Sequence, residues 1–304
     1  KIIDTKAPSL TLKGKEKIEL TLGDNFVEPG FEALDNVDGD LTEKVSVESN
    51  LDLDTVGEYT LSYLVEDTSG NTTSHKRVVN IVALPEPEPT TVNPTTSQKG
   101  VIYLTFDDGS HATRTDAVLD ILKREGIKAT FFVTGKGPDA PIKRIYHEGH
   151  AIALHTYTHD YAKLYASVEA YYDDLNKVSD YVENITGHKS MLIRFPGGTS
   201  NTISRNYSPG IMSTLVKDVT NKGYVYHDWN VDSMDASGNV GAQKVISSTI
   251  NGLSKNRPNI VLMHDIHQQT VDALPTIIQY GKNNGYTFKA ITMDTKPVQH
   301  GVNN

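Results

Sequence analysis

The chain has 304 residues, a formal net charge of -9 and no cysteine. This length allows one or two domains with a sizeable core. The negative charge argues against a nucleic-acid-binding protein, which normally shows a basic face, and the lack of cysteine excludes disulfides and thiol catalysis. No apolar segment approaches the ~18 to 20 residues that span a bilayer. Because the sequence starts at Lys1 rather than Met, we expect a mature form from which an upstream signal peptide or anchor could have been removed.

Residues 1–83 contain short segments in which apolar and polar residues mostly alternate. This period of two is typical of half-buried strands, and turns rich in Gly and Pro separate the segments. Five or more short strands without a helical segment predict a small β-sandwich. The predicted strands are Ser9–Leu12, Ile18–Leu22, Val45–Val47, Tyr59–Val65 and Val78–Val82.

Three stretches of this region form a recognisable pattern: FxxPGFEAxDxxDGDLT from Phe26 to Thr42, then 56–59 and 67–71. They resemble the immunoglobulin-like domains of bacterial cell-surface proteins. We therefore expect an extracellular or cell-surface location, with residues 1–83 as a candidate for contact with the cell wall. Asp35, Asp38 and Asp40 could hold calcium, but the loop lacks the ordered ligands of a dedicated site, and solvated turn carboxylates are the commoner arrangement.

Residues 84–99 are rich in Pro and Thr and lack apolar periodicity, which predicts an extended, semi-rigid linker. From residue 100 to 304, strand-like and helix-like segments alternate, and this order predicts an α/β domain with parallel strands in a barrel or a doubly wound sheet. The predicted strands are Val101–Phe106, Ala129–Val133, Met191–Phe195, Tyr224–Trp229 and Asn259–His264, and the predicted helices are Arg114–Glu125, Val168–Ile185, Gly241–Leu253 and Thr270–Lys282.

Polar residues follow several of these strands, at the end where (β/α) barrels carry their chemistry. They are Asp107, Asp108, Arg194, Asp232, His264 and Asp265, with His155 and His159 beyond the apolar run 151–154. Two histidines four residues apart reach the same side of a helical turn and commonly hold a metal. Asp108 would complete a three-ligand set that suits zinc and leaves a position open. Asp107, beside the cation, could then serve as a base.

Five motifs occur in order along the domain: TFDDG at 105–109, HxxxH at 155–159, RFPGG at 194–198, DxxD at 232–235 and LxH at 262–264. Together they resemble the polysaccharide deacetylase family, also called the NodB-homology family or carbohydrate esterase family 4. The resemblance covers residues 100 to about 296 and implies a distorted (β/α) barrel. The stretch from His264 to Pro275 further resembles peptidoglycan N-acetylglucosamine deacetylases.

The resemblance implies a role for each matching residue. A divalent metal, usually Zn²⁺ with Co²⁺, Mn²⁺ or Ni²⁺ as alternatives, would be bound by Asp108, His155 and His159. Asp107 would be the general base, held by an ion pair with Arg194, and His264 the general acid, oriented by Asp232. The backbone N–H of Gly197 would help to form the oxyanion hole, and Leu262 would line the pocket for the acetyl methyl group.

Two positions depart from the family pattern and bear on substrate fit more than on chemistry. Gly197 stands where a large aromatic residue is common, which predicts a more open groove wall. Ala236 stands where Trp usually follows the DxxD motif, and Trp229 could occupy some of that space. Tyr157, Tyr161 and Tyr165 could stack on sugar rings, although tyrosines with a surface hydroxyl are common.

Three functions remain open. The first is metal-dependent removal of the acetyl group from N-acetylglucosamine in cell-wall peptidoglycan, with release of acetate. The second is deacetylation of another glycan, such as chitin oligomers, poly-N-acetylglucosamine or acetylxylan. The third is a non-catalytic wall-binding protein, against which the intact Asp107, Arg194 and His264 argue, because a binding module needs no acid and base.

Overall fold

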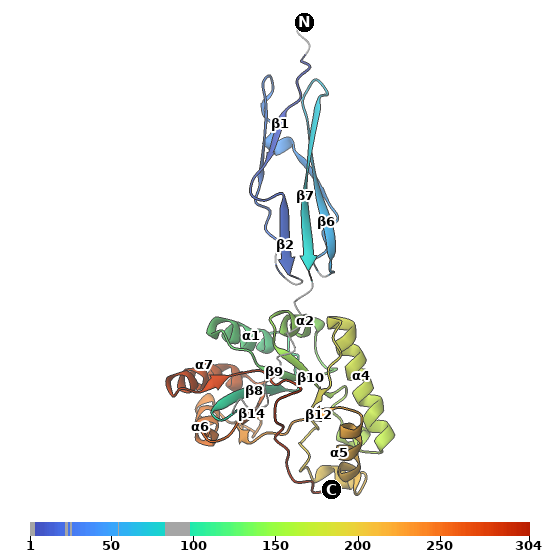
Figure 1. The fold of residues 1–304 in the computed structure, drawn as a ribbon, viewed down its shortest axis with the longest axis vertical. Helices are drawn as coiled ribbons and strands as arrows, with labels where there is room; N and C mark the ends of the chain where they lie inside the picture. Colours follow the sequence, from blue (N-terminus) through green and yellow to red (C-terminus); the bar gives the residue numbers. More distant parts are fainter. Residues whose placement is uncertain (1–3, 22–23, 25, 54, 83–97) are drawn as a thin grey trace. The chain divides into compact units, whose positions relative to one another are not determined.

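The computed structural model describes residues 4–21, 24, 26–53, 55–82 and 98–304. The chain divides into two compact units, residues 1–89 and 90–304 (Figure 1). Apart from its last two residues, the predicted linker 84–99 lies outside the described part of the chain. Among the described residues, no helix is both long and apolar enough to cross a bilayer.

The N-terminal unit is a β-sandwich, as its alternating pattern predicts. Its core is formed by inward-facing side chains of both sheets, among them Leu10, Ala33, Tyr63 and Val79. One sheet has the order β1-β3-β4 and the other β2-β7-β6-β5. The strands are β1 (Ser9–Leu12), β2 (Lys17–Thr21), β3 (Phe31–Asp35), β4 (Gly39–Asp40), β5 (Ser46–Ser49), β6 (Gly57–Glu66) and β7 (Thr72–Val82), with one short 3-10 helix, η1 (Thr42–Lys44).

The C-terminal unit is built on a parallel sheet that curves into a half-barrel with the order β12-β11-β10-β9-β8-β14-β13, and β15 pairs with β8. Every residue of β8 is buried, as expected for a parallel strand covered on both faces. The strands are β8 (Val101–Asp107), β9 (Thr130–Thr134), β10 (Ala151–Thr156), β11 (Leu192–Ile193), β12 (Val225–Tyr226), β13 (Val231–Asp232), β14 (Asn259–His264) and β15 (Thr287–Phe288).

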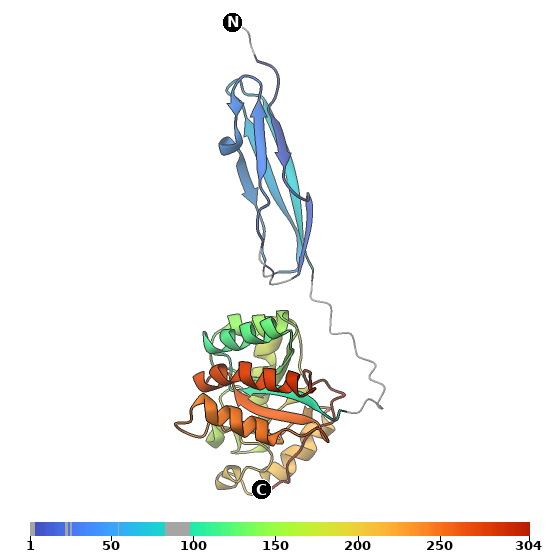
Figure 2. The same cartoon turned by 90° about the vertical axis from the view of Figure 1, so that its left-hand side faces the viewer.

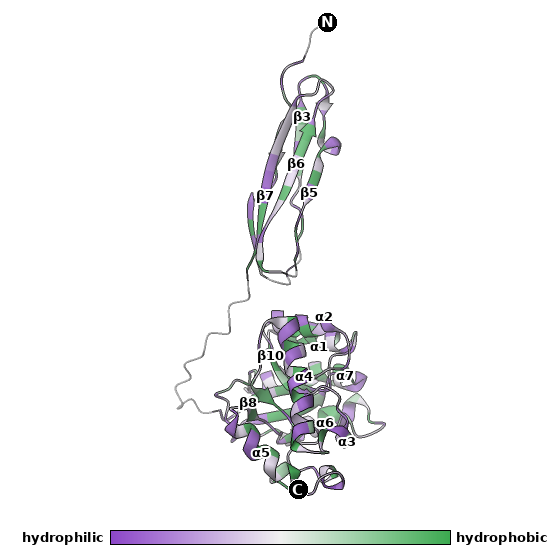
Figure 3. Cartoon of the chain, turned by 90° about the vertical axis from the view of Figure 1, so that its right-hand side faces the viewer, coloured by the Kyte–Doolittle hydropathy of each residue, from purple (hydrophilic) through white to green (hydrophobic). Residues whose placement is uncertain are grey.

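Helices cover the outside of this sheet, with α4 and α5 towards one end and α6 and α7 side by side towards the other (Figures 1 and 2). Apolar strands lie inside and polar helix surfaces outside, as Figure 3 shows for β8 and α4. The helices are α1 (Arg114–Glu125), α2 (Asp139–His147), α3 (Tyr161–Leu164), α4 (Val168–Thr186), α5 (Ile211–Asn221), α6 (Ala242–Gly252) and α7 (Gln268–Asn283), with the 3-10 helix η2 (Ile203–Asn206).

Two layers of the core decide where the functional side chains lie. Leu104 and Phe106 of β8 belong to the core between sheet and helices, whereas Val101 and Tyr103 belong to a separate cluster. Since successive side chains of a strand point to opposite faces, the odd-numbered residues of β8 share the inner face of the half-barrel. Asp107 therefore ends β8 on this inner face.

Candidate active site

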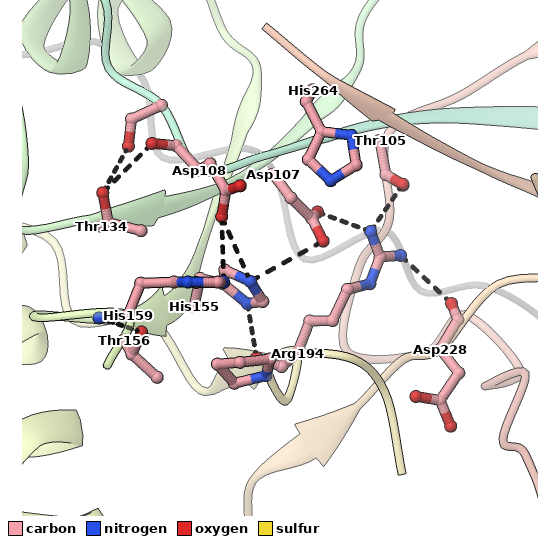
Figure 4. A network of polar contacts seen from close by, with 12 residues as sticks. Thr105, Asp107, Asp108, Thr134, His155, Thr156, His159, Arg194, Asp228 and His264 are labelled. Carbon is pink, nitrogen blue, oxygen red and sulfur yellow. Dashed lines mark hydrogen bonds and ion pairs between the residues drawn. The ribbon is translucent and has the colours of Figure 1, made fainter. Parts of the chain in front are cut away.

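Asp107 and Arg194 form a buried ion pair on the inner face of the half-barrel. Only 3% of Asp107 is exposed, and Arg194, which follows β11, is fully buried. Nη1 of Arg194 donates to Oδ1 of Asp107 at 2.7 Å and to the hydroxyl of Thr105 at 2.8 Å (Figure 4). The pair fixes the direction of the carboxylate, whose other oxygen, Oδ2, lies 4.0 Å from Nε2 of His155.

The guanidinium of Arg194 is fixed on its other sides as well. Nε donates to the carbonyl of His227 at 2.8 Å, and Nη2 donates to the carbonyl of Asp228 at 3.1 Å. Its central carbon lies 4.0 Å from the centre of the Phe132 ring. A planar group with this many donors in fixed directions cannot be replaced by lysine without loss. Asp107 is thus held by a rigid partner.

Three potential metal ligands meet beside Asp107, and we call Asp108, His155 and His159 the Asp/His/His cluster. Oδ1 of Asp108 lies 3.5 Å from Nε2 of His155 and 3.3 Å from Nε2 of His159 (Figure 4). This oxygen is buried and has no hydrogen-bond partner in the described part of the chain. A buried carboxylate oxygen without a partner is costly unless a cation binds it. Two imidazoles and a carboxylate are also a donor set that suits zinc, so the residues fit a divalent metal.

His155 presents the ring nitrogen that a metal requires. Its Nδ1 lies 2.8 Å from the backbone carbonyl of Arg194. A carbonyl oxygen only accepts hydrogen bonds, so Nδ1 carries the proton and Nε2 turns its lone pair towards Asp108. Burial lowers the pKa of His155, which keeps the imidazole neutral, as ligation demands. Arg194 therefore holds Asp107 through its side chain and orients a ligand through its carbonyl.

The two histidines do not lie on one helical turn, contrary to the prediction from their spacing. β10 continues to Thr156, so His155 is still in extended backbone, and His159 lies in the following turn with a φ of 49°. The carboxylate of Asp174 in α4 holds this turn by accepting the N–H of Thr158 at 3.1 Å and its hydroxyl at 2.6 Å. The strand end and this held turn bring both rings to Asp108.

The carboxylate bound to His264 belongs to Asp235. Its Oδ1 lies 2.9 Å from Nδ1 of His264, and its Oδ2 accepts the N–H of His264 at 2.7 Å and the hydroxyl of Thr270 at 2.6 Å. The prediction that Asp232 orients His264 is therefore wrong. Asp232 is exposed and accepts the N–H of Met234 at 2.8 Å. Asp232 ends β13 with an exposed side chain, and the chain passes through Met234, which has a left-handed φ of 62°, before it reaches Asp235, of which 1% is exposed.

His264 is placed and charged as an acid. Burial lowers the pKa of its imidazole, but the Asp235 carboxylate, with smaller contributions from Asp107 and Asp108, outweighs burial and raises the pKa to about 9. In the view of Figure 4 the ring lies above Asp107, whereas the rings of His155 and His159 lie below it. The site therefore has a potential acid and a potential metal centre on two sides of one carboxylate.

Gly109 closes the TFDDG motif because no side chain fits there. A Cβ at this position would lie 2.3 Å from Oδ2 of Asp265, the residue after His264. Asp265 is fully buried, accepts the hydroxyl of Thr115 at 2.5 Å, and has a pKa that burial raises to about 7. The glycine lets the end of β8 approach the end of β14, which brings the residues of both strand ends into one site.

The space beside Gly197 is partly filled by another side chain, so the missing aromatic residue does not leave it empty. Gly197 is exposed, with a φ of 75°. A Cβ built on it would lie 2.7 Å from the hydroxyl oxygen of Tyr161 and 3.1 Å from Cβ of Asn201. Tyr161 is the first residue of α3, two positions after His159. A side chain from another segment thus occupies the space in front of Gly197.

Leu262 and Trp229 lie at the edges of this arrangement. Leu262 of β14 is 8% exposed and pairs with Asp232 of β13. The indole of Trp229 would lie 3.0 Å from a Cβ at Gly198, and its ring is 5.9 Å from the guanidinium carbon of Arg194. These contacts place Trp229 on the Arg194 side of the site, while a substrate contact, or filling of the space at Ala236, stays a prediction.

The N-terminal unit holds a second group of potential ligands, which we call the Asp/Asp/Asp cluster: Asp4, Asp35 and Asp67. Each offers one carboxylate oxygen, and these oxygens lie within 4.8 Å of one another. The sequence pattern groups Asp35 with Asp38 and Asp40 instead. In the structure, the carboxylates of Asp38 and Asp40 accept hydrogen bonds from N–H and hydroxyl groups of loop residues. They therefore stabilise the conformation of these loops.

Comparisons with known proteins agree with this geometry. Residues 95–209 match the family model for polysaccharide deacetylase, and residues 10–81 match that for the Ig-like domain of bacterial surface proteins. The putative polysaccharide deacetylase YheN of Bacillus subtilis (strain 168) is 35% identical over 204 residues, which are 65% of this chain and 69% of the relative. The chain belongs to the polysaccharide deacetylase family.

Two further matches bear on the type of deacetylase. A peptidoglycan-N-acetylglucosamine deacetylase of Bacillus cereus (strain ATCC 14579) is 35% identical over 202 residues, which are 64% of this chain and 70% of the relative. The crystal structure of the catalytic domain of peptidoglycan N-acetylglucosamine deacetylase from Eubacterium rectale ATCC 33656 is similar with a TM-score of 0.66 and 42% identity, and the match covers 68% of this chain and 94% of that one. The half-barrel is thus the hydrolase domain of a polysaccharide deacetylase, preceded by an immunoglobulin-like domain.

Proposed function

We propose that this chain removes the acetyl group from N-acetylglucosamine residues of peptidoglycan by metal-dependent hydrolysis and releases acetate. The observation that carries the proposal is the position of Asp107, with Arg194 behind it, the Asp/His/His cluster on one side and His264 on the other. A base, a metal centre and an acid around one space are what amide hydrolysis requires. The names of the relatives support N-acetylglucosamine in peptidoglycan as the substrate.

The Asp/His/His cluster would hold the cation. Zn²⁺ fits its two imidazoles and one carboxylate, and Co²⁺, Mn²⁺ and Ni²⁺ are alternatives for the same donors. When bound, the cation would polarise the acetyl carbonyl and lower the pKa of a water molecule. The other steps are carried by side chains and backbone of the chain itself.

Asp107 would act as the general base. Arg194 occupies Oδ1, which leaves Oδ2 to take a proton from the water that attacks the acetyl carbon. Arg194 is fully buried, and its guanidinium also donates hydrogen bonds to the carbonyls of His227 and Asp228 and to the hydroxyl of Thr105. The Asp107 carboxylate therefore keeps its orientation while the proton is transferred. A positioned general base typically contributes about 10²- to 10⁴-fold to the rate.

Attack on the carbonyl gives a tetrahedral oxyanion, which needs hydrogen-bond donors. The N–H of exposed Gly197 makes no hydrogen bond within the described residues, so it is free to donate to this oxygen. One such donor is typically worth ~2.7 to 4 kcal/mol. Leu262 would line the pocket for the methyl group.

His264 would act as the general acid. Its Nδ1 is bound to Asp235, so Nε2 is the atom that would give its proton to the departing nitrogen as the C–N bond breaks. The pKa of about 9 keeps the ring protonated at neutral pH. The products are acetate and a glucosamine with a free amine, which adds positive charge to the glycan.

The same centre could act on another glycan, and one observation keeps this alternative open. Ala236, next to Asp235, leaves the groove without the large side chain that the family pattern has there. Chitin oligomers, poly-N-acetylglucosamine and acetylxylan are therefore the substrates to compare with peptidoglycan. We further propose that the protein acts outside the cell or at its surface, with residues 1–83 in contact with the cell wall, since the first domain belongs to a bacterial surface type.

Acetate release from defined substrates tests the proposal. The metal-loaded full chain is incubated with purified peptidoglycan, chitin oligomers, poly-N-acetylglucosamine and acetylxylan, each with and without a chelator. We expect release from peptidoglycan that the chelator abolishes and added Zn²⁺ restores. Faster release from another glycan would identify that glycan as the substrate. No release from any of the four would contradict the deacetylase function and favour a non-catalytic wall-binding protein.

A further inference from the structure

The side chain of Tyr161 occupies the position in front of the proposed oxyanion donor. Its hydroxyl oxygen lies 2.7 Å from where a Cβ of Gly197 would be. Since N and Cβ of one residue are about 2.5 Å apart, the hydroxyl and the N–H of Gly197 are separated by at most about 5 Å. A single oxygen atom between them can accept from both at ordinary distances of about 2.7 to 3.2 Å.

The ring of Tyr161 is held by its neighbours. It meets the ring of His159 edge-on at 5.7 Å and lies 5.7 Å from the ring of Tyr165. Tyr165 is fully buried, and its hydroxyl donates to the carbonyl of Pro196 at 2.9 Å, one residue before Gly197. Tyr161 is thereby connected both to a potential metal ligand and to the loop that carries the oxyanion donor.

The hydroxyl of Tyr161 has no hydrogen bond among the described residues, although the side chain is half-buried. Buried tyrosine hydroxyls usually have a partner, as that of Tyr165 does. Gly197, which the hydroxyl faces, is exposed, so the hydroxyl points to a place that a substrate can reach.

We propose that Tyr161 is a second oxyanion donor, whose hydroxyl hydrogen-bonds the acetyl oxygen together with the N–H of Gly197. The inference rests on the proposed deacetylase function and adds a residue to it. It also gives a reason for the glycine at 197: any side chain there would displace the hydroxyl from its position. Tyr161 then fills, from another segment, part of the space that the missing side chain at 197 leaves.

The variant Tyr161→Phe removes the hydroxyl and keeps the ring, so its packing on His159 and Tyr165 is retained. An oxyanion donor acts on the transition state, so we expect kcat to fall about 10- to 100-fold with KM within about threefold of wild type. Metal content and melting temperature should not change. The matched control is Tyr207→Phe, which removes the hydroxyl of a tyrosine that is 44% exposed at the end of η2.

A binding measurement separates this inference from the proposed function. The probe is a methylphosphonamidate of glucosamine, whose tetrahedral phosphorus carries oxygens like those of the transition state. We expect the metal-loaded Tyr161→Phe variant to bind it at least about tenfold more weakly than wild type, and Tyr207→Phe to bind it equally well. Wild-type affinity in Tyr161→Phe, or a loss confined to KM, would overturn the role of Tyr161. Failure of the wild type to release acetate would overturn the proposed function instead. The binding measurement with the phosphonamidate would still show whether the Tyr161 hydroxyl contacts the tetrahedral group.

Discussion

Each domain contains three residues that could hold a metal, but the surroundings of the two clusters differ. The Asp/His/His cluster lies beside a buried ion pair and faces a protonated histidine. In the Asp/Asp/Asp cluster, Oδ1 of Asp35 accepts two N–H groups of its own turn, and Oδ1 of Asp67 accepts two more. One cluster is placed next to a base and an acid, whereas the other closes turns.

The ligand atoms differ in a way that matches these surroundings. In the deacetylase domain, Oδ1 of Asp108 has no hydrogen-bond partner among the described residues, and Nδ1 of His155 is bound to the carbonyl of Arg194, which directs Nε2 towards Asp108. In the immunoglobulin-like domain, the carboxylates of Asp35 and of Asp67 carry loop hydrogen bonds, which lower the pKa of both carboxyl groups, although Oδ2 of Asp35 is also buried without a partner among the described residues. Three potential metal ligands close together are therefore not enough to indicate a catalytic site. The acid and the base next to the Asp/His/His cluster are what distinguish it from the Asp/Asp/Asp cluster.

The largest effect is expected from removing a ligand of the Asp/His/His cluster. His155→Ala should release the metal and reduce acetate release to background, because two ligands cannot replace three. The loss of metal affinity should exceed the roughly 10- to 100-fold that removal of an outer partner costs. Metal content by elemental analysis checks this, with His75→Ala, an exposed histidine of the other domain, as control. A His155→Ala protein that retained its full metal content would contradict the ligand set.

Asp107→Asn should abolish most activity while it leaves the metal in place. The amide keeps an oxygen for Arg194 but cannot accept the proton of water, so kcat should fall about 10²- to 10⁴-fold. Steady-state kinetics together with metal analysis separate this result from that of His155→Ala. Unchanged acetate release would show that another group is the base.

The choice between Asp235 and Asp232 is tested through pH dependence. A general acid must be protonated, so activity declines on the alkaline side as pH rises through the pKa of His264, near 9. In Asp235→Asn the anion that raises this pKa is lost while burial still lowers it. The alkaline limb of kcat/KM should therefore move down by at least about one pH unit. Asp232→Asn should leave the alkaline limb where it is in wild type. A shift in Asp232→Asn and none in Asp235→Asn would show that Asp232, and not Asp235, orients His264.

This pair also shows how far the sequence could predict the site. The motifs identify both carboxylates, but which one reaches His264 depends on the left-handed backbone at Met234, and no local pattern requires that conformation. The position of Tyr161 against Gly197 depends on two separate segments of the chain, and the sequence suggested Tyr161 only as a residue that could stack on a sugar ring. By contrast, the residues at the ends of β8 and β14 follow from the parallel sheet itself, because neighbouring strands end at the same edge.

The fold was predictable where a segment is long enough to show a period. The continuous apolar run of β8 and the helical spacing of α1 gave both elements to within one residue. β11 and β12 lie within the predicted strands Met191–Phe195 and Tyr224–Trp229, but only two residues of each pair with a neighbouring strand, and the sequence pattern does not show where pairing stops. α5 does carry the signal, with buried apolar residues at 211, 212, 215 and 219, and was missed.

The smallest effect is expected from the other cluster. Asp67→Asn should leave acetate release and metal content unchanged and lower the melting temperature of the immunoglobulin-like domain at neutral pH. The hydrogen bonds of Asn71 lower the pKa of Asp67 below its usual value. Such a carboxylate stabilises the fold above its unfolded pKa of about 3.9, and the contribution is lost as pH falls further. The difference in melting temperature between wild type and variant should therefore shrink below about pH 4, whereas Glu48→Gln, an exposed neutralisation in β5, should show no such trend. Loss of acetate release in Asp67→Asn would mean that the acidic cluster serves the reaction after all, and the contrast between the two domains would fail.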